Sequence, residues 1–517
     1  MSRTASLALL ASAVFVGGAS AQPKVTAPPD AVFDKFRAND KDAARKFYKK
    51  HLDVNGLSVL AAGEVADEAL VRTHHIVTHM LAGRPDVLEA MAKAGTRLII
   101  IGKDQVYTDM PEYRNTANAA YMNERVRGTG GLGVTSFGEE NLLNLAGDRY
   151  DDESIGVHEF LHTIDAALSR VDVGWRNRLS EVYKGAMAKG LWKNSYAASN
   201  AAEYWAEIAQ SYFDCNRVNN WNHGPIATRE QLKQHDPDGY ELVRKTMNLT
   251  PATDWRYTPL RAQPSVVAPP AKFKFDAYYT KFTYAREFPV LGSKHASDAA
   301  LLAANDTVRK MFAYRHDILK AMIADGARLV VLGRDERLSD LPEFAGAKNK
   351  AELDLVRYCD YTPALKLMVL PEENVLRLPK EPFAGKCMTV SVFAKGLYRV
   401  TGLRPADPEF ENRREKQQYE LRVKRLDIEF DKRLTKLFDA ATEKKLWKGT
   451  AAARDRAEYW AAGVEAYFDA GGTGVAPNGA DRPVTTRELL KVYDPELFAL
   501  VDETMAFKER VDWRAKR

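Results

Sequence analysis

The sequence repeats itself, and this repeat limits the possible folds more than any other feature. The segment Arg97–Asp104, an apolar run that ends in Gly-Lys-Asp, returns as Arg328–Asp335, where the run ends in Gly-Arg-Asp. Farther along, Ala-Glu-Tyr-Trp-Ala at 202–206 returns at 457–461. A repeat over this distance indicates two copies of one structural unit of about 240 residues each. We therefore expect each copy to form its own hydrophobic core.

Alternating element types within a copy favour an α+β fold. Arg97–Ile101 is predicted as a buried strand, and Glu139–Leu145 as a second one. The helical spacing of apolar residues predicts helices over three later segments, Ser154–Leu168, Trp175–Lys189 and Asn200–Phe213. Each copy should therefore combine a small mixed sheet with several helices that follow it.

The N-terminus has the features of an export signal. Arg3 is followed by the apolar run Leu7–Gly18 and by the small-residue cleavage site Ala19-Ser20-Ala21. We expect residues 1–21 to be removed and the mature chain to be secreted or periplasmic. The rest of the chain is then divided into a first copy at 22–258, a proline-containing linker at 259–272 and a second copy at 273–517.

Composition excludes several classes of partner. The 517 residues have a net charge of only +5, so we expect no nucleic acid and no anionic lipid as a partner. Beyond the leader, no run approaches the roughly 20 apolar residues that a membrane span requires. Three cysteines are too few for a disulfide framework. Cys359 and Cys387 could pair in an oxidising compartment or remain free, and Cys215 is left single in either case.

The strongest chemical signal is His-Glu-Phe-Leu-His at 158–162, inside a predicted helix. Four residues make just over one turn, so the imidazoles of His158 and His162 project from the same face. Two such nitrogens suit one Zn²⁺ ion, and Glu159 is placed to act on a water molecule beside it. The alternative interpretation is a surface helix with two solvated histidines.

This motif, followed by a Tyr-x6-Glu-x3-Glu pattern that starts at Tyr196, resembles the gluzincin metallopeptidases and most closely their lethal-factor-like branch. The resemblance covers roughly residues 152–214. It implies that the two motif histidines and Glu203 bind zinc, that the motif glutamate is the general base and acid, and that Tyr196 supplies a hydroxyl to the transition state. It also implies that Asp165 and Glu207 orient the ligands. Without the resemblance, the two later glutamates are a helix-capping partner and a surface residue.

The second copy lacks most of these residues. Alignment on the flanking sequence puts Phe393–Leu397 at the place of the histidine motif, so both histidines and the base are missing. Ala451 and Ala462 replace the tyrosine and the second glutamate of the downstream pattern, whereas Glu458 persists in place of the first. One carboxylate cannot hold a catalytic zinc ion. We therefore predict two tandem zincin-like domains, the second being a degenerate, pseudo-catalytic copy without the metal site.

Two further patterns are weaker signals. Gly128–Gly133 fits a dinucleotide-binding glycine fingerprint, but no strand clearly precedes it and no helix immediately follows it. We expect instead a loop that leads into an edge strand beside the zinc cleft, where an extended peptide could add by β-pairing. His75 and His79 are also one turn apart but have no intervening glutamate and no obvious third ligand. For this pair we expect a solvated helix face.

The sequence thus predicts a secreted, zinc-dependent metallopeptidase that hydrolyses bonds of a peptide or protein substrate. The main alternative is a non-enzymatic exported binding protein with duplicated domains and a structural or vestigial zinc site. Hydrolysis of another amide, such as a cell-wall crosslink, is a third possibility. We favour the peptidase because base, ligands and hydroxyl occur together, whereas a structural zinc site needs no base.

Overall fold

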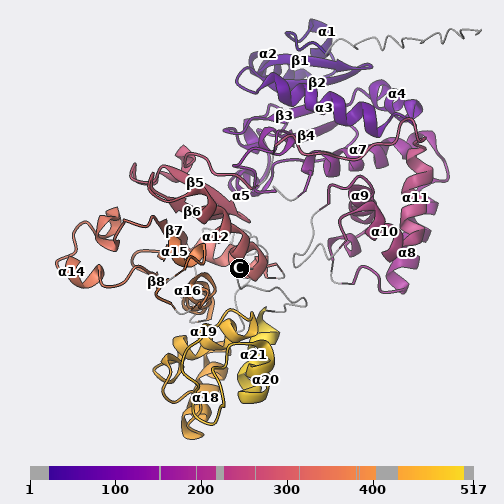
Figure 1. Ribbon diagram of the computed structural model, residues 1–517. Coiled ribbons are helices and arrows are strands. Elements are labelled where there is room, and N and C mark those ends of the chain that lie inside the picture. Colours follow the sequence, from indigo (N-terminus) through magenta and orange to yellow (C-terminus); the bar gives the residue numbers. More distant parts are fainter. Residues whose placement is uncertain are drawn as a thin grey trace, which may run out of the picture.

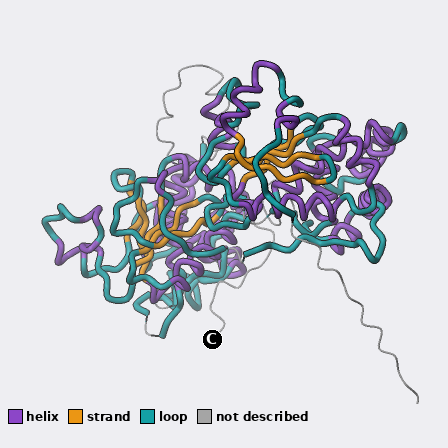
Figure 2. Tube along the Cα trace, turned by 90° about the horizontal axis from the view of Figure 1, so that it is seen from above, coloured by secondary structure: helices purple, strands orange, loops and turns teal. Residues whose placement is uncertain are grey.

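The computed structural model describes residues 23–150, 153–193, 195–216, 226–261, 264–313, 315–379, 381–383, 385–402 and 429–505. The predicted leader at 1–21 lies outside the described residues. Figure 1 shows the chain passing from a first half, coloured indigo to magenta, into a second half that ends in yellow. Each half has its own group of strands, surrounded by helices (Figure 2). Within the described ranges, no helix is both long and apolar enough to cross a membrane.

The first half begins with a four-stranded sheet in the order β1–β2–β3–β4. Strands β1 (Tyr48–Val54) and β2 (Leu57–Ala62) form an antiparallel hairpin. Strands β3 (Arg97–Ile101) and β4 (Val134–Gly138) then add in parallel, which confirms the strand predicted at Arg97–Ile101. The sheet is therefore mixed and small, as expected.

Strand β3 shows how the sheet separates two cores. Its side chains alternate, so Leu98 and Ile100 enter the larger core and Ile99 and Ile101 enter a smaller one. The larger core also contains α3 (Asp67–Met80), α4 (Pro85–Lys93) and the later helices of the first half. The smaller core is closed by α1 (Asp30–Phe33) and α2 (Lys41–Phe47) on the opposite face. A strand buried on both faces explains the unbroken apolar run in the sequence.

The strand predicted at Glu139–Leu145 is wrong. This segment begins with a short helix, α6 (Glu139–Leu142), and the strand is the preceding β4. The carboxylate of Glu139 is buried and accepts backbone N–H groups from Ala66 and Lys103, each at 2.8 Å. These two residues lie just beyond the ends of β2 and β3, so the segment bends across the sheet end instead of extending it.

The later part of the first half is helical, as predicted. Its helices are α7 (Ile155–Val171), α8 (Trp175–Ala188), α9 (Ala201–Tyr212), α10 (Arg229–His235) and α11 (Pro237–Met247). Ser154 caps α7 by accepting one backbone N–H, and Asn200 caps α9 by accepting two. The indole N–H of Trp205 on α9 donates to the carbonyl of Leu161 on α7 at 3.0 Å, which fixes the rotation of one helix against the other.

The second half has a five-stranded sheet in the order β5–β6–β7–β9–β8. The strands are β5 (Lys281–Ala285), β6 (Phe288–Gly292), β7 (Arg328–Leu332), β8 (Cys359–Thr362) and β9 (Leu367–Pro371). Its longer described helices are α12 (Asp298–Met311), α13 (His316–Ala324), α16 (Met388–Leu397), α18 (Phe430–Glu443), α19 (Arg456–Tyr467) and α21 (Pro495–Met505). Strand β8 forms the edge of this sheet. Its counterpart in the described part of the first half is a single β-bridge between Thr129 and Ser136.

A hydrogen bond shared by the two halves corrects the alignment at the histidine motif. The indole of Trp460 on α19 donates to the carbonyl of Ala394 on α16 at 3.0 Å, as Trp205 does to Leu161. The motif at 158–162 therefore corresponds to Ser391–Lys395, not to Phe393–Leu397. The connection between β7 and β9, which contains β8, is two residues longer than the connection between β3 and β4. The sequence alignment had allowed for four extra residues, so it placed the motif two residues too far along the second half.

The three cysteines are all free in the structure. Of the two possibilities for Cys359 and Cys387, the unpaired one therefore holds. Burial raises the pKa of the Cys359 thiol to about 11, so at neutral pH it is protonated. A thiol in this state is a poor nucleophile, and we assign no chemistry to it.

Candidate metal centre

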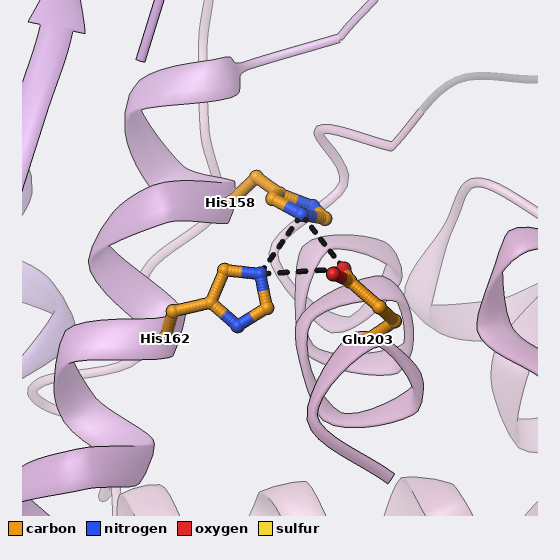
Figure 3. Close-up of side chains that lie close together, drawn as sticks. All are labelled: His158, His162 and Glu203. Atoms are coloured by element: carbon orange, nitrogen blue, oxygen red, sulfur yellow. Dashed lines mark hydrogen bonds and ion pairs between the residues drawn. The ribbon is translucent and has the colours of Figure 1, made fainter. Parts of the chain in front are cut away.

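The candidate site lies where α7 crosses α9, and α7 contributes its two histidines. His158 is buried and His162 is half-buried on the face of α7 that meets α9. Their Nε2 atoms lie 3.2 Å apart and point to the same spot (Figure 3). The i, i+4 spacing thus brings both imidazoles together, and the alternative of two solvated histidines is wrong.

Helix α9 contributes the third group. Glu203 follows the Asn200 cap by three residues, and its carboxylate turns toward α7 (Figure 3). Glu203 Oε2 lies 3.3 Å from Nε2 of His158 and 3.3 Å from Nε2 of His162. The capping interpretation of this helix is right for Asn200 alone, because the glutamate faces the histidines.

The three ligand atoms have the spacing of a tetrahedral metal site. Bonds of about 2.0–2.1 Å to a tetrahedral zinc ion place any two ligand atoms about 3.3–3.4 Å apart. The observed separations are 3.2, 3.3 and 3.3 Å. Among the described residues, buried Glu203 Oε2 has no hydrogen-bond donor, which would be costly unless another positive group satisfies it. His158, His162 and Glu203 form a cluster that could hold a metal ion.

The charges around the cluster favour a bound cation. Burial alone would lower the pKa of His158, but the adjacent Glu203 carboxylate and the nearby Glu159 and Glu207 carboxylates raise it to about 10. Burial likewise tends to raise the pKa of Glu203, and the two histidines more than offset this and hold it well below its usual range. The protein thus surrounds the two imidazoles with negative charge, which is the environment expected of a cation site.

Glu159 and Tyr196 lie beside this cluster. Loss of solvent raises the pKa of Glu159, whereas His158 and His162 lower it, and burial dominates. A carboxyl with a raised pKa is suited to accept and return a proton near neutral pH. Tyr196 opens a short helical turn before α9, and its ring stacks on His158 with the ring centres 6.3 Å apart.

Gln210 also supports the site, and sequence reasoning missed it. Its Oε1 lies 2.7 Å from Nδ1 of His158, so it accepts the ring N–H and leaves Nε2 for a metal. Glu207 Oε1 lies farther from the same nitrogen, at 3.8 Å, and is completely buried. Gln210 follows Glu203 by seven residues, which is two helical turns. This spacing places both residues on one face of α9, so the sequence could have indicated that Gln210 also faces the histidines.

Asp165 lies elsewhere. Its carboxylate accepts the indole N–H of Trp175 at 2.7 Å and the guanidinium of Arg176 at 2.8 Å. Both partners belong to α8, so the contacts observed for Asp165 join α7 to α8 and do not include a histidine. The observed contacts of its carboxylate therefore give no support to the expectation that Asp165 orients a metal ligand.

The glycine segment packs directly on α7. A β-carbon at Gly130 would clash with the carbonyl oxygen of Glu159 and with the β-carbon of His162. Thr129 pairs with Ser136 of β4 by two backbone hydrogen bonds, so the segment borders the sheet next to the site. This arrangement agrees with the expected loop that leads into an edge strand and not with a phosphate-binding turn.

The second histidine pair forms a packing contact. The rings of His75 and His79 are 3.9 Å apart and lie 6.0 and 5.9 Å from the ring of Trp255. Burial, together with the neighbouring His79, lowers the pKa of His75 to about 4, so it is neutral. The expected solvated helix face is wrong, because both rings are half-buried against the tryptophan.

Comparisons with known proteins add little to this geometry. No protein family and no curated protein matches the sequence. Among solved structures, the chain is similar to the Pro-Pro endopeptidase PPEP-2 from Paenibacillus alvei, with 17% sequence identity and a TM-score of 0.25. The similarity covers 36% of this chain and 96% of that one. At this level the likeness supports no assignment, so the function has to be inferred from the site itself.

Proposed function

We propose that the chain is a zinc-dependent peptidase whose first half holds the ion through His158, His162 and Glu203. The observation that carries the proposal is the triangle of ligand atoms, with sides of 3.2, 3.3 and 3.3 Å, closed by residues from two helices. Three protein ligands leave one position of a tetrahedral ion open, which is typical of catalytic and not of structural zinc.

Zn²⁺ held there would supply a Lewis acid for the scissile carbonyl and would lower the pKa of a water molecule. Glu159 is the group that takes the proton from the attacking water and delivers it to the leaving amine. Tyr196 is the group that donates its hydroxyl to the developing oxyanion, a contribution of about 3–4 kcal/mol in comparable sites. Gln210 holds His158 in the tautomer that presents Nε2.

The wider proposal includes the arrangement of the chain. We propose an exported protein with two zincin-like copies, at 22–258 and 273–517, joined by a linker at 259–272. The similar strand orders and the equivalent Trp205 and Trp460 hydrogen bonds support the duplication. The gluzincin ligand set of two histidines and a downstream glutamate agrees with the resemblance found in the sequence.

Metal analysis followed by cleavage of a peptide library tests this function. The parent chain is expected to contain one zinc ion and to cleave peptides, and His162→Ala to lose both. His79→Ala is the matched control, because His79 also lies one turn from another histidine but outside the candidate site. If the His162→Ala variant still contained zinc, the assignment of His158, His162 and Glu203 as the zinc ligands would be wrong. Zinc without cleavage of any peptide would favour the non-enzymatic binding protein.

A further inference from the structure

The second half has a counterpart for each group of the candidate metal centre. With the corrected alignment, Ser391 corresponds to His158, Lys395 to His162 and Glu458 to Glu203. The ligand set of two imidazoles and a carboxylate has thus become a hydroxyl, an ammonium and a carboxylate. The crossing of the two helices is nevertheless kept, because α16 meets α19 as α7 meets α9.

Lys395 is almost completely buried at this crossing. Its side chain is only 4% exposed, and its Nζ lies 2.8 Å from Oε1 of Glu458. A second carboxylate oxygen, Oδ2 of Asp360, lies 3.0 Å from the same nitrogen. Lysines are almost never buried to this degree unless they are paired, so the ammonium must balance a local excess of negative charge.

The second carboxylate is itself a change from the first half. Asp360 lies in β8 at the position that corresponds to Gly130, since Cys359 pairs with Val369 as Thr129 pairs with Ser136. In the first half a side chain at Gly130 would clash with α7. In the second half the side chain is present and reaches the lysine. Glu458 also accepts a hydrogen bond from Arg454 at 2.9 Å, so two cations and two carboxylates balance one another.

We infer that the Lys395 ammonium replaces the metal ion in the second half. It bridges α16, α19 and β8, which is the crosslink that the ion would give between α7 and α9, and it does so with hydrogen bonds instead of coordination. The inference rests on the assignment of His158, His162 and Glu203 as a metal centre. Its consequence is a second half that folds without metal and has no place for one.

Ser391 is consistent with this replacement. Its hydroxyl is buried, and among the described residues its Oγ has no hydrogen-bond partner. A serine at this place is too short to extend to the ion position from α16, and a neutral hydroxyl is a weak zinc ligand. Among the described residues, Lys395 and Arg454 are the cations that pair with Glu458.

Removal of the ammonium tests the inference directly. In the full-length protein, Lys395→Met should leave Asp360 and Glu458 short of a cation, and hydrogen exchange in α16 and α19 should rise roughly a hundredfold or more. Lys444→Met is the matched control, because Lys444 also pairs with a glutamate in this half, Glu496 at 3.1 Å, but both side chains are more than half exposed. The control should change exchange by less than about fivefold. Equal effects of the two variants would overturn the inference.

Adding Asp360→Asn and Glu458→Gln to Lys395→Met should restore much of the protection, because the uncompensated charges are then gone. No recovery would mean that the lysine acts only by filling space, which also overturns the inference. These measurements need no metal in the first half, so they can fail or succeed independently of the proposed peptidase.

A rebuilt site gives a metal readout. Asp360→Gly, Ser391→His and Lys395→His, made in a His162→Ala background that silences the first site, should bind one zinc ion per chain where the background binds none. Hydrogen exchange on the same sample establishes that α16 and α19 are folded. A folded variant that binds no zinc, or a parent chain that binds two zinc ions, would overturn the inference. If the rebuilt chain fails to fold, the Lys395→Met comparison decides the question.

Discussion

Asp236 in the first half and Asp494 in the second occupy the same place and make the same contacts. Each accepts a tyrosine hydroxyl and a tryptophan indole, at 2.6 and 2.8 Å in the first half and at 2.8 and 2.9 Å in the second. At the helix crossing, by contrast, two histidines correspond to Ser391 and Lys395. These packing contacts are thus shared, whereas the His158, His162 and Glu203 cluster is found, among the described residues, in the first half alone.

In both halves a glutamate faces the helix crossing: Glu203 faces two histidines, and Glu458 faces the Lys395 ammonium. The comparison teaches that the carboxylate is kept while its partners change. A carboxylate that persists without its histidines would usually be taken as structural. The structure gives the reason for its persistence, since Glu458 still pairs with the group that closes the crossing.

The largest expected effect concerns the proposed base. Glu159→Gln should lower the rate of peptide cleavage by about 10²–10⁴-fold, because the amide cannot accept the proton of the attacking water. Zinc content should be unchanged, since the ligands remain. Steady-state assays with metal analysis on the same preparation measure both. Turnover at the parental rate would show that the base lies elsewhere, and the contrast between the halves would then lose its chemical meaning.

The next effect tests what the halves share. Asp236→Ala and Asp494→Ala each remove a buried carboxylate that accepts two side-chain hydrogen bonds, so each should cost its own half about 2–4 kcal/mol of unfolding free energy. Hydrogen exchange resolved by peptide assigns the loss to one half. Strongly unequal losses would show that the two networks are not equivalent, despite their matching contacts.

A smaller effect is expected at the histidine partner. Gln210→Ala removes the acceptor of the His158 ring N–H and should weaken zinc binding about 10–100-fold. Competition with a chromogenic chelator measures the change. Gln231→Ala is the control, because Gln231 caps the neighbouring α10 and does not contact the site. If both variants bind zinc like the parent, the orientation of His158 is set by other contacts.

The smallest effect compares the two hairpin turns. The β1–β2 turn is Asn55-Gly56 with φ of 50° and 88°, whereas the β5–β6 turn is Arg286-Glu287 with φ of 51° and 70°. Gly56→Glu should destabilise the first half by about 1–2 kcal/mol, because a side chain is disfavoured in the left-handed region.

Glu287→Gly removes the same strain from the second half but also the ion pairs of Glu287 with Arg149 at 3.7 Å and Lys320 at 3.6 Å. Thermal unfolding should therefore change less for this variant than for Gly56→Glu. A larger change would mean that the turn is held mainly by its ion pairs and not by backbone preference.

Part of the site could be predicted from spacing. The four-residue interval between His158 and His162 predicted two imidazoles on one helix face, and the capping signal at Asn200 predicted the start of a second helix. That Glu203 turns toward the histidines was implied by the family resemblance and not by spacing. What the flanking sequence could not supply was the exact register of α16 against α7, and the alignment placed Lys395 opposite Phe160 instead of His162. A single lysine within the apolar run Met388–Leu397 was the available signal, because a buried lysine requires partners.

The roles of the polar residues around the site were harder to predict. Asp165 and Glu207 were chosen by resemblance, and the structure gives the shorter contact with His158 to Gln210. Asp165 instead bonds to α8. Which of several acidic or amide groups reaches a ring nitrogen depends on the rotation of α9, and this is fixed by the long-range Trp205 bond to Leu161. A local pattern contains no information about such a contact.

The bare backbone at Gly130 has a mechanical consequence. No side chain separates the border of the sheet from the turn of α7 that carries Glu159 and His162. A displacement of that border would therefore be transmitted directly to this turn of α7, because no flexible side chain lies between them to absorb it. We expect the sheet border and the histidine turn to move together.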